Sequence, residues 1–353
     1  MTPPTDQTPI RTAIIGFGTG GRVFHAPLLA ADPRFSVDVV VTANPERQRL
    51  AALACPDAAL ESTPDALFDY PDRVDLVVIS TPPDSHRDLA RAAIQHGLAA
   101  VVDKPFVVRP DQGRELIKEA QQHQTLLTVF QNRRYDGDFA TVQGLVGDGS
   151  LGEIRSMESR FEWWKPDEPK AWKAQAGPQT GGGMLFDLGP HLLDQAFQLF
   201  GPATTVHAEL TRYRPGDGGD DEAFVSLDHA SGVRSHLAMS SLAPLERPRF
   251  TVTGSRAGYV KWGLDIQESQ LGQGMSPHAD DYGREPKDRW GRIGLREQSG
   301  VVPTEPGRYG AFYSTLAQAL LHGAPPPVDP TEALTVIECI DQIYATTPIT
   351  RRG

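Results

Sequence analysis

A glycine-rich turn near the N-terminus restricts the fold of this chain more than any other feature. The apolar run Ala13–Ile15 is followed at once by Gly16-x-Gly18-x-x-Gly21, and apolar residues at helical spacing come next. In a dinucleotide-binding strand–turn–helix, the first glycine permits the tight turn, the second lets a pyrophosphate approach, and the third lets the helix pack on the strand. The N–H groups at the start of the helix then face the phosphates. An ordinary strand–turn–helix is the alternative.

Residues 11–131 alternate short apolar runs with helical patterns, which predicts a doubly wound, parallel α/β sheet. Continuous Val, Ile and Leu runs indicate strands that are buried on both faces. We therefore expect a Rossmann domain that binds NAD(P) over residues 10–131, preceded by a disordered tail at residues 1–9. The predicted strands are Ala13–Ile15, Val37–Val41, Leu76–Ile79, Ala99–Val102 and Leu126–Phe130, and the predicted helices are Pro45–Ala54, Asp84–His96 and Pro110–Gln122.

The pattern changes after residue 131, where polar and apolar residues begin to alternate along successive strands. Such strands, joined by short turns, indicate a largely antiparallel sheet in a second, α+β domain at residues 132–353. The stretch 267–308 is polar and rich in Gly and Pro, and its length predicts a lid, an interface arm or a mobile loop. The predicted strands are 154–163, 206–212, 223–228, 233–239, 250–254 and 259–262, and the predicted helices are Phe139–Val146, Gly310–Leu321 and Pro330–Tyr344.

The composition argues against several classes of partner. The formal charge of −11 disfavours nucleic acid and anionic membranes. No apolar stretch reaches the roughly 20 residues that a membrane span needs, and residues 1–9 lack the apolar core of a signal peptide. Cys55 and Cys339 are expected to be packing residues. We expect a cytoplasmic protein.

The end of the second predicted strand bears on the choice of nucleotide. NAD-specific sites place an acidic residue about 20 residues beyond the glycines, where it binds the ribose 2′-hydroxyl. Here the strand ends at Thr42, with no acid. Arg47, and Arg22 across the loop, are candidates to bind a 2′-phosphate. This favours NADP over NAD, although a solvated Arg47 remains the alternative.

Three polar stretches follow predicted strands at the sheet edge where such domains bind ligands. They are Ser80–His86, Val102–Phe106 and Gln131–Arg134. Lys104 comes directly after a predicted buried strand in the sequence, which is unusual for a lysine. A surface lysine beside a Pro turn is the alternative.

A fourth stretch, in the second domain, pairs a carboxylate with an imidazole. Asp187 and His191 are four residues apart and share one helix face, and Pro190 is expected in the early part of that helix. A carboxylate beside an imidazole orients it and raises its basicity. A capping Asp with a buried His is one alternative. Zinc is another, but no Cys pair or His-rich motif accompanies the two residues, so no metal is expected.

These motifs resemble, in order and over nearly the whole chain, the glucose–fructose oxidoreductase / inositol dehydrogenase (Gfo/Idh/MocA) family. Asp103 stands where the family usually has Glu. Three segments, Gly21–Pro27, Asn132–Asp136 and His191–Gln195, are similar to the branch of NADP-dependent scyllo-inositol dehydrogenases. The motifs that carry the resemblance are the glycine turn, Thr81-Pro82 with His86, Asp103-Lys104-Pro105, and Gly181-Gly182-Gly183 with Asp187-x-Gly189-x-His191-x-x-Asp194.

The resemblance implies a role for each site residue. Lys104 would bind the substrate hydroxyl and favour its alkoxide, next to a cis bond to Pro105. Asp187 would orient sugar hydroxyls, and His191 would be the general base in oxidation or the acid in reduction. Arg160 and Trp172 are further candidates for the substrate pocket. The expected cofactor-binding residues are Gly16, Phe17, Gly18, Gly21, Arg22, Thr42, Arg47, Thr81, Pro82, His86, Asp103, Lys104 and Asn132.

The expected function is that of an NAD(P)-dependent dehydrogenase acting on a secondary alcohol of a cyclic polyol or sugar. Two alternatives stay open, a non-catalytic NAD(P)-sensing regulator on the same fold and a glycosidase that oxidises its substrate transiently with bound NAD. The resemblance also implies an open C-terminal sheet whose exposed face forms a homodimer or homotetramer. Nucleic acid and membrane partners are not expected.

Overall fold

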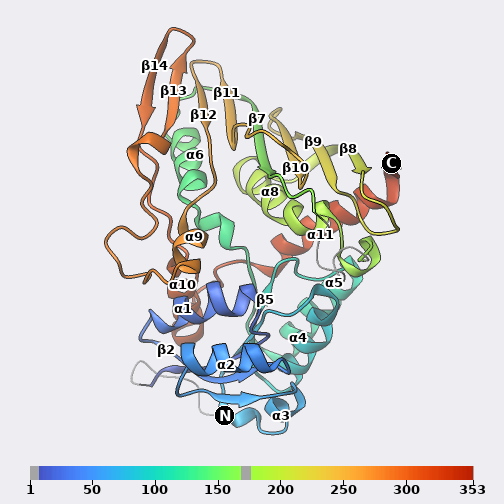
Figure 1. The fold of residues 1–353 in the computed structure, drawn as a ribbon, viewed down its shortest axis with the longest axis vertical. Helices are drawn as coiled ribbons and strands as arrows, with labels where there is room; N and C mark the ends of the chain where they lie inside the picture. The colour runs from blue at the N-terminus through green and yellow to red at the C-terminus, as the bar shows by residue number, and fades with distance from the viewer. Residues whose placement is uncertain (1–7, 168–175, 353) are drawn as a thin grey trace. The chain divides into compact units, whose positions relative to one another are not determined.

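The computed structural model of the protein describes residues 8–167 and 176–352, which form two compact units (Figure 1). The predicted domain boundary at residue 132 stays a prediction. In the structure, two segments beyond residue 132 pack with the first unit. The first unit comprises the residues up to Asn132, Gln267–Tyr282 and Arg308–Leu334; the second comprises Arg133–Ile266, Gly283–Gly307 and the residues from Thr335 onward.

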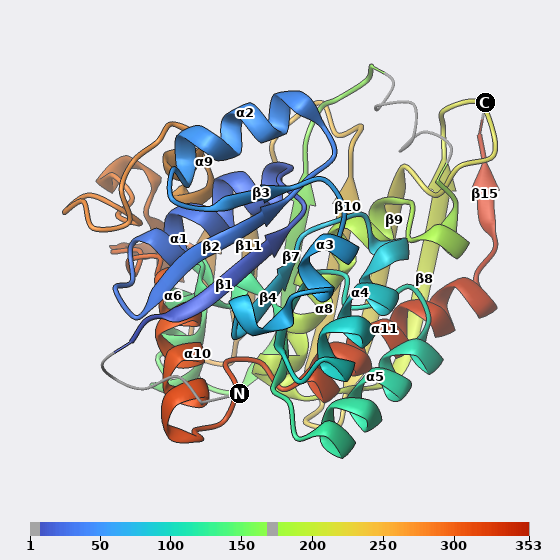
Figure 2. The ribbon, with the colours of Figure 1, turned by 90° about the horizontal axis from the view of Figure 1, so that it is seen from below.

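The first unit is built on a six-stranded parallel sheet, which confirms the predicted Rossmann domain. The strand order is β3-β2-β1-β4-β5-β6, and β1, β2 and β3 lie side by side in Figure 2. The order reverses between β1 and β4, and ligands of such sheets bind at this switch point. Its strands are β1 (Ile10–Ile15), β2 (Phe35–Val41), β3 (Ala59–Glu61), β4 (Leu76–Ile79), β5 (Ala99–Asp103) and β6 (Leu127–Phe130).

Helix α2 of this unit begins where the sequence provides a cap. In α2, the Asn44 side chain accepts the N–H of Arg47 at 3.0 Å and Pro45 is the first residue, so the helix starts as predicted. The short elements β3 and α3 were not predicted. The helices are α1 (Ala26–Ala30), α2 (Pro45–Ala54), α3 (Asp65–Phe68), α4 (His86–Gln95), α5 (Pro110–His123), α9 (Gln267–Gly272) and α10 (Gly310–His322).

Helix α10 belongs to the first unit through its aromatic residues. The rings of Phe130 and Phe312 have centroids 4.9 Å apart, and Tyr313 packs edge-on against Phe35 at 5.5 Å. These side chains are buried, so the C-terminal segment completes the core of the nucleotide-binding unit. The helical pattern predicted the helix but not the unit to which it belongs.

The second unit holds a nine-stranded, mostly antiparallel sheet, as predicted. Among the strands that the structure describes in this sheet, β7 with β10 and β8 with β15 pair in parallel, and the other pairs are antiparallel. The order is β14-β13-β12-β11-β7-β10-β9-β8-β15. The strands are β7 (Ile154–Glu162), β8 (Ala203–Arg212), β9 (Glu222–His229), β10 (Arg234–Ser240), β11 (Phe250–Gly254), β12 (Gly258–Lys261), β13 (Gly291–Leu295), β14 (Gln298–Val302) and β15 (Ile349–Arg351).

One helix of this unit positions the candidate site. Helix α8 (Met184–Phe200) packs against β7, β9 and β10, whose inward residues, such as Met157, Leu237 and Met239, are buried. Helix α6 (Gly137–Gly147) contacts α8, and α11 (Pro330–Thr346) begins in the first unit and ends in the second. The polar-out alternation of the strands therefore predicted correctly which face is covered.

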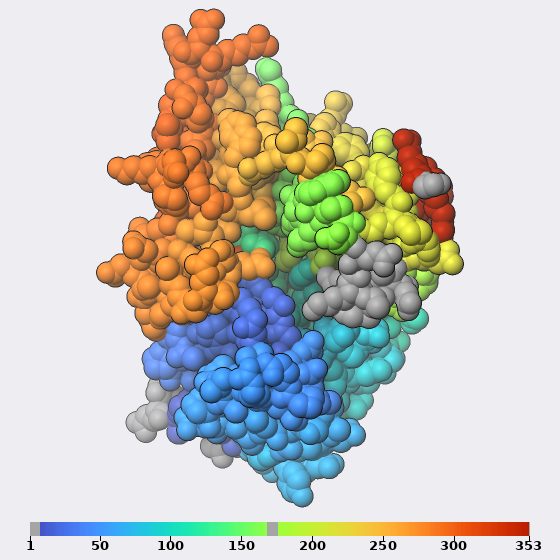
Figure 3. All heavy atoms as spheres, in the orientation of Figure 1, coloured from blue at the N-terminus to red at the C-terminus, as the bar shows by residue number. Residues whose placement is uncertain are grey.

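The stretch 267–308 is more regular than expected. It contains α9 and the hairpin β13–β14, which extends the sheet at one edge and projects in dark orange in Figure 3. The hairpin has few apolar residues, and the backbone of Gly294 has φ 141°. The strands of the hairpin were not predicted, because the exposed edge strand β14 carries no apolar signal. The role of this stretch as a lid, an interface arm or a mobile loop stays a prediction.

The described part of the chain contains no helix that combines the length and apolarity needed to cross a membrane. Cys55 and Cys339 are both buried, and burial raises the pKa of their thiols to about 11 and about 12. They are packing residues, as expected.

Candidate functional site

The glycine turn is shaped by the ends of the neighbouring strands. Gly16 has φ 95°, and a Cβ there would lie 2.3 Å from the Ser80 carbonyl oxygen. A Cβ on Gly21 would lie 2.1 Å from the Gly16 oxygen, so the following helical turn packs closely on the strand, as the spacing predicted. Gly20 also has no room for a side chain, because Ser80 Oγ lies 2.2 Å from its Cβ position. The sequence motif does not include this fourth glycine.

Gly18 differs from these three glycines because its side-chain position is open. The nearest atoms to a Cβ there belong to the Arg47 guanidinium, at 3.9 Å. Arg22 and Arg47 are exposed, and Thr42 is buried directly after β2. An open glycine beside an exposed guanidinium fits a dinucleotide, whose phosphates need a bare backbone and positive charge.

A buried polar network fixes the end of β5. Asp103 accepts hydrogen bonds from Ser80 Oγ at 2.6 Å and from His25 Nε2 at 3.1 Å, and His25 Nδ1 lies 2.6 Å from the Tyr313 hydroxyl. Burial alone would raise the pKa of Asp103, but the charge and hydrogen bond of His25 and the Ser80 hydroxyl outweigh it and lower the pKa. Asp103 is therefore a carboxylate that holds its loop in place. His25 and Tyr313 were missed because they are far apart in sequence.

Lys104 follows this network directly. The bond between Lys104 and Pro105 is cis, as the resemblance implied, and Lys104 is partly exposed. Lys104 therefore lies on the same edge of the sheet as the glycine turn, at the carboxyl end of β5.

His86 has a different place from the expected one. Its ring is fully buried, with Nδ1 2.9 Å from the Pro105 oxygen and Nε2 2.9 Å from the Thr81 oxygen. Both neighbours are backbone oxygens, one from each of the two loops that flank the ring. His86 thus ties the Thr81 loop to the Lys104 loop. We therefore correct its assignment from contacting the cofactor to positioning the two loops.

The other expected cofactor residues of the first unit gather at the carboxyl ends of its strands. Phe17 is buried, so it offers a ligand its backbone only, and Asn132 is largely buried just after β6. Thr81 is partly exposed and Pro82 is exposed, in the loop that follows β4. The structure therefore brings these residues to one edge of one sheet.

Helix α8 presents Asp187 and His191 on one face. Asp187 is partly exposed, whereas His191 is buried with its ring edge-on to Phe161 at 5.9 Å. Pro190 lies inside the helix rather than at its start, which corrects the expected position. A buried imidazole one turn from an accessible carboxylate can exchange a proton with a bound hydroxyl compound.

The remainder of α8 is fastened by polar contacts that the sequence did not reveal. Arg134 binds both carboxylate oxygens of Asp194, at 2.5 and 2.7 Å. Gln195 donates to the Arg133 oxygen at 2.8 Å and accepts from the buried Arg249 at 2.7 Å. The segments Asn132–Asp136 and His191–Gln195 thus contact each other, which gives a physical reason for their occurrence together.

Arg160 does not share the face of β7 that carries Phe161. It pairs with Glu158 at 2.6 Å and with Glu162 at 3.7 Å, while Phe161 packs against His191 on the other face. Successive strand residues point to opposite faces. Arg160 thus lies on the face of β7 opposite to the one that contacts His191, and its assignment to the substrate stays a prediction. Trp172 lies outside the described residues.

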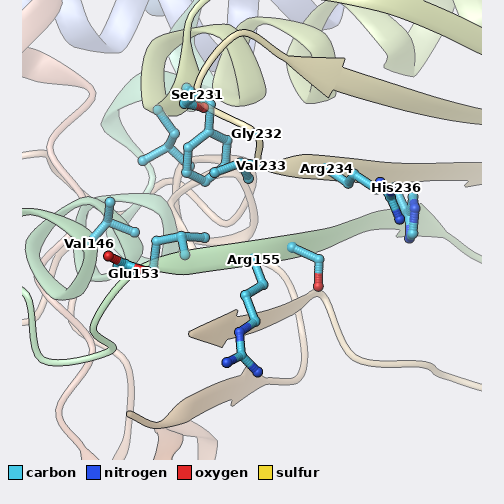
Figure 4. A pocket seen from close by; sticks show the side chains of 12 residues that line it. Val146, Glu153, Arg155, Ser231, Gly232, Val233, Arg234 and His236 are labelled. Atoms are coloured by element: carbon cyan, nitrogen blue, oxygen red, sulfur yellow. The ribbon is translucent and has the colours of Figure 1, made fainter. Parts of the chain in front are cut away.

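A hollow of about 860 Å³ in the second unit lies elsewhere, at the start of β7 and β10 (Figure 4). Arg234 pairs in register with Ser156, so Arg155 points to the opposite face of the sheet. The cations around this hollow therefore do not converge on one ligand. The described residues also contain no cluster of three or more His, Cys, Asp or Glu that could hold a metal.

Lys104 and the cofactor residues thus belong to the first unit, and Asp187 and His191 belong to the second.

Comparison with known proteins finds one family model for each of two parts of the chain. Residues 10–131 match the "Oxidoreductase family, NAD-binding Rossmann fold", and residues 139–260 match the "GFO/IDH/MocA C-terminal domain". The chain is 38% identical over 334 residues to the uncharacterized oxidoreductase YdgJ of Escherichia coli, covering 94% of each chain. It is 30% identical over 336 residues to the scyllo-inositol 2-dehydrogenase (NADP(+)) IolW of Bacillus subtilis, covering 94% of this chain and 92% of that one.

A solved structure of an oxidoreductase also resembles this chain over most of its length. An oxidoreductase from Yersinia pestis superposes with a TM-score of 0.87 at 36% identity, covering 96% of this chain and 95% of the other. Both family matches, the relatives and this structure confirm the resemblance seen in the motifs. The chain belongs to the NAD-binding Gfo/Idh/MocA family of oxidoreductases.

Proposed function

We propose that the protein is a cytoplasmic, NADP-dependent dehydrogenase that acts on a secondary alcohol of a cyclic polyol or sugar. The substrate class is supported by the Bacillus subtilis relative, which is named for scyllo-inositol and NADP. The observation that carries the proposal is the placement of Asp187 and His191 on one face of α8, with His191 buried. A regulator that only senses the nucleotide does not need this pair.

The proposed roles follow from the chemistry of alcohol oxidation. When bound, the nicotinamide supplies the hydride acceptor. His191 takes the hydroxyl proton as general base, and it returns a proton in the reverse reaction. The Lys104 ammonium donates a hydrogen bond to the oxygen as negative charge develops there. Asp187 accepts hydrogen bonds from neighbouring hydroxyls and so selects the ring orientation.

The preference for NADP is supported by two observations in the first unit. No acidic residue occurs at the end of β2, where Thr42 stands, so no carboxylate repels a 2′-phosphate. The Arg47 guanidinium lies beside Gly18 in the glycine turn. Arg47 would therefore bind the 2′-phosphate, and Arg22 is a second candidate for this contact.

The oligomer is also part of the proposal. We propose that the face of the nine-stranded sheet opposite α8 pairs with a second copy, giving a homodimer or homotetramer. Support comes from this face, where the polar residues Glu158, Arg160 and His236 lie in neighbouring strands. Their mixed charges suit pairing of this face with the same face of another copy.

The test begins with a screen of inositols and aldoses, following NADPH absorbance. With the best substrate, His191→Ala and Lys104→Ala should each lower kcat about 100-fold or more, while NADPH still binds. The matched controls are His123→Ala and Lys118→Ala, which remove the same residue types from the exposed surface of α5. Near-normal turnover in both site variants would refute the roles. Cleavage of aryl glycosides with retained cofactor would favour a glycosidase, and nucleotide binding without any turnover would favour a regulator.

A further inference from the structure

The glycine triplet Gly181–Gly183 has no part in the roles above, and the structure explains its last member by packing. Gly183 has φ 102°, and a Cβ there would lie 2.3 Å from Asp220 Oδ1 and 2.9 Å from the Tyr344 hydroxyl. A distant carboxylate and a distant phenol therefore occupy the space next to Gly183. This space lies at the start of α8, the helix of Asp187 and His191.

Asp220 caps this helix from outside. Its backbone oxygen accepts the Met184 N–H at 3.0 Å, and its Oδ2 accepts the Leu185 N–H at 2.9 Å. Gly183, which precedes the helix, has no side chain to do so. The first N–H groups of a helix need acceptors, and the positive end of the helix dipole favours a carboxylate there. Asp220 provides both the hydrogen-bond acceptors and the carboxylate at the start of α8.

Asp220 is itself held on its other oxygen. The Tyr344 hydroxyl donates to Oδ1 at 2.5 Å, and the Tyr344 ring stacks on Phe186, in the first turn of α8, at 5.5 Å. Asp220 is 2% exposed. Burial raises its pKa to about 6, although the hydrogen bonds of Tyr344 and Leu185 oppose the rise. The carboxylate is thus placed where desolvation disfavours it.

The cap acts on the part of α8 that carries the proposed site. Leu185 is two residues before Asp187, and the Asp187 N–H donates to the Gly183 oxygen at 3.0 Å. The first turn of α8 therefore fixes the Asp187 backbone, and His191 follows one turn later. Farther along, α8 is fastened separately through Asp194 and Gln195.

We propose that Asp220, held by Tyr344, is a positioning residue that sets the first turn of α8 and, through it, Asp187 and His191 for the reaction. The proposal rests on the proposed function of those two residues. In this proposal Asp220 acts on Asp187 and His191 through the helix backbone rather than by direct contact. A misplacement of about 1 Å at a reacting group can cost about 100-fold in rate, so the expected effect is large.

The neighbouring Asp221 is a matched control. It is buried to a similar degree, at 5% exposed, and its carboxylate accepts the N–H groups of Tyr213 and Arg214 at 2.9 and 2.8 Å and pairs with the Arg214 guanidinium. These contacts hold the loop after β8 rather than the start of α8. Asp221→Ala therefore removes an equally buried carboxylate without removing the cap.

The experiment compares Asp220→Ala, Asp220→Asn, Tyr344→Phe and Asp221→Ala in the full chain, with scyllo-inositol and NADP⁺. We expect Asp220→Ala to lower kcat about 10- to 100-fold and to speed amide exchange of Leu185, with the Kd for NADPH unchanged. Asp220→Asn keeps an acceptor for Leu185 and should restore most of kcat. Tyr344→Phe should give an intermediate loss, because the cap remains but loses its support.

The outcomes separate this proposal from the one it rests on. If His191→Ala abolishes turnover while folded Asp220→Ala keeps normal kcat or normal Leu185 exchange, the positioning role is overturned and the proposed function stands. If Asp221→Ala loses kcat as strongly as Asp220→Ala, the effect is general destabilisation and the positioning role is again overturned. If His191→Ala is fully active, both proposals fall. If Asp220→Ala does not fold, Tyr344→Phe and Asp220→Asn carry the test. A kcat of Tyr344→Phe equal to that of the wild type would then overturn the positioning role.

Discussion

Two glycine-rich segments in this protein precede a helix, and they have opposite relations to the space around them. In the first unit, the side-chain position of Gly18 is open, with Arg47 at 3.9 Å as its nearest neighbour. In the second unit, the position beside Gly183 is filled by Asp220. One turn leaves a helix start available to a ligand's phosphates, and the other lets the protein's own carboxylate occupy a helix start. A glycine motif before a helix is thus not by itself an anion site.

The largest effect is expected where the turn is open. Gly18→Ala would place a methyl group in the space that the pyrophosphate needs, without a clash in the protein itself, since the nearest atom to its Cβ is 3.9 Å away. We expect the Kd for NADPH to rise about 1,000-fold, about 4 kcal/mol, with an unchanged Tm. Fluorescence titration measures the Kd. Normal affinity would show that the cofactor does not approach this glycine.

The filled turn should respond in the opposite way. Gly183→Ala places a Cβ 2.3 Å from Asp220 Oδ1 in a backbone conformation with φ 102°. We expect a loss of about 3–4 kcal/mol in stability, seen as a lower Tm, and an unchanged Kd for NADPH. A variant as stable as the wild type would contradict the packing role of the triplet, and one with weaker cofactor binding would remove the contrast between the two turns.

The charge on Asp220 should appear in the pH dependence of stability. Its pKa is raised from 3.8 to about 6, so between these values the folded state binds more protons than the unfolded state. Stability from this group is therefore present at low pH and falls as pH rises through about 4 to 6, by up to about 3 kcal/mol. Asp220→Asn cannot titrate, so its Tm relative to the wild type should rise between pH 4 and pH 7. A constant difference across this range would contradict the raised pKa.

The smallest effect concerns the choice of nucleotide at the open turn. Arg47→Ala should reduce the preference for NADPH over NADH about tenfold, which is about 1.4 kcal/mol. The reason is the loss of one charged hydrogen bond to the 2′-phosphate. Kd values for both nucleotides measure the preference, with Arg49→Ala, an exposed arginine on the same helix that pairs with Glu46, as control. Equal losses for NADPH and NADH would place Arg47 at the pyrophosphate instead.

The sequence predicted features that depend on neighbouring residues. Continuous apolar runs gave the five longest strands of the parallel sheet, and Asn44 with Pro45 marked the start of α2 because capping is local. The glycine spacing predicted that Gly18 would be open and Gly21 closely packed. Each of these follows from residues within one turn or one strand.

Features that depend on distant residues were missed or misplaced. His86 was assigned to the cofactor, but its ring binds the oxygens of Thr81 and Pro105, and the second of these is 19 residues away. Arg160 was assigned to the substrate, and only its strand register shows that it faces away from His191. Asp220 carried no motif at all, because its effect depends on where α8 begins rather than on its own neighbours.

The first unit contains segments from distant parts of the chain, and we expect this to affect when it folds during synthesis. The core around Phe130 is completed by Phe312 and Tyr313, which come much later in the sequence. N-terminal units usually fold first as a chain emerges from the ribosome. We expect the nascent sheet of the first unit to expose this aromatic surface until α10 is made. A chain cut after residue 131 should therefore aggregate rather than bind nucleotide. We therefore expect the nucleotide site to form only after α10 is made, although its glycine motif is translated well before that helix.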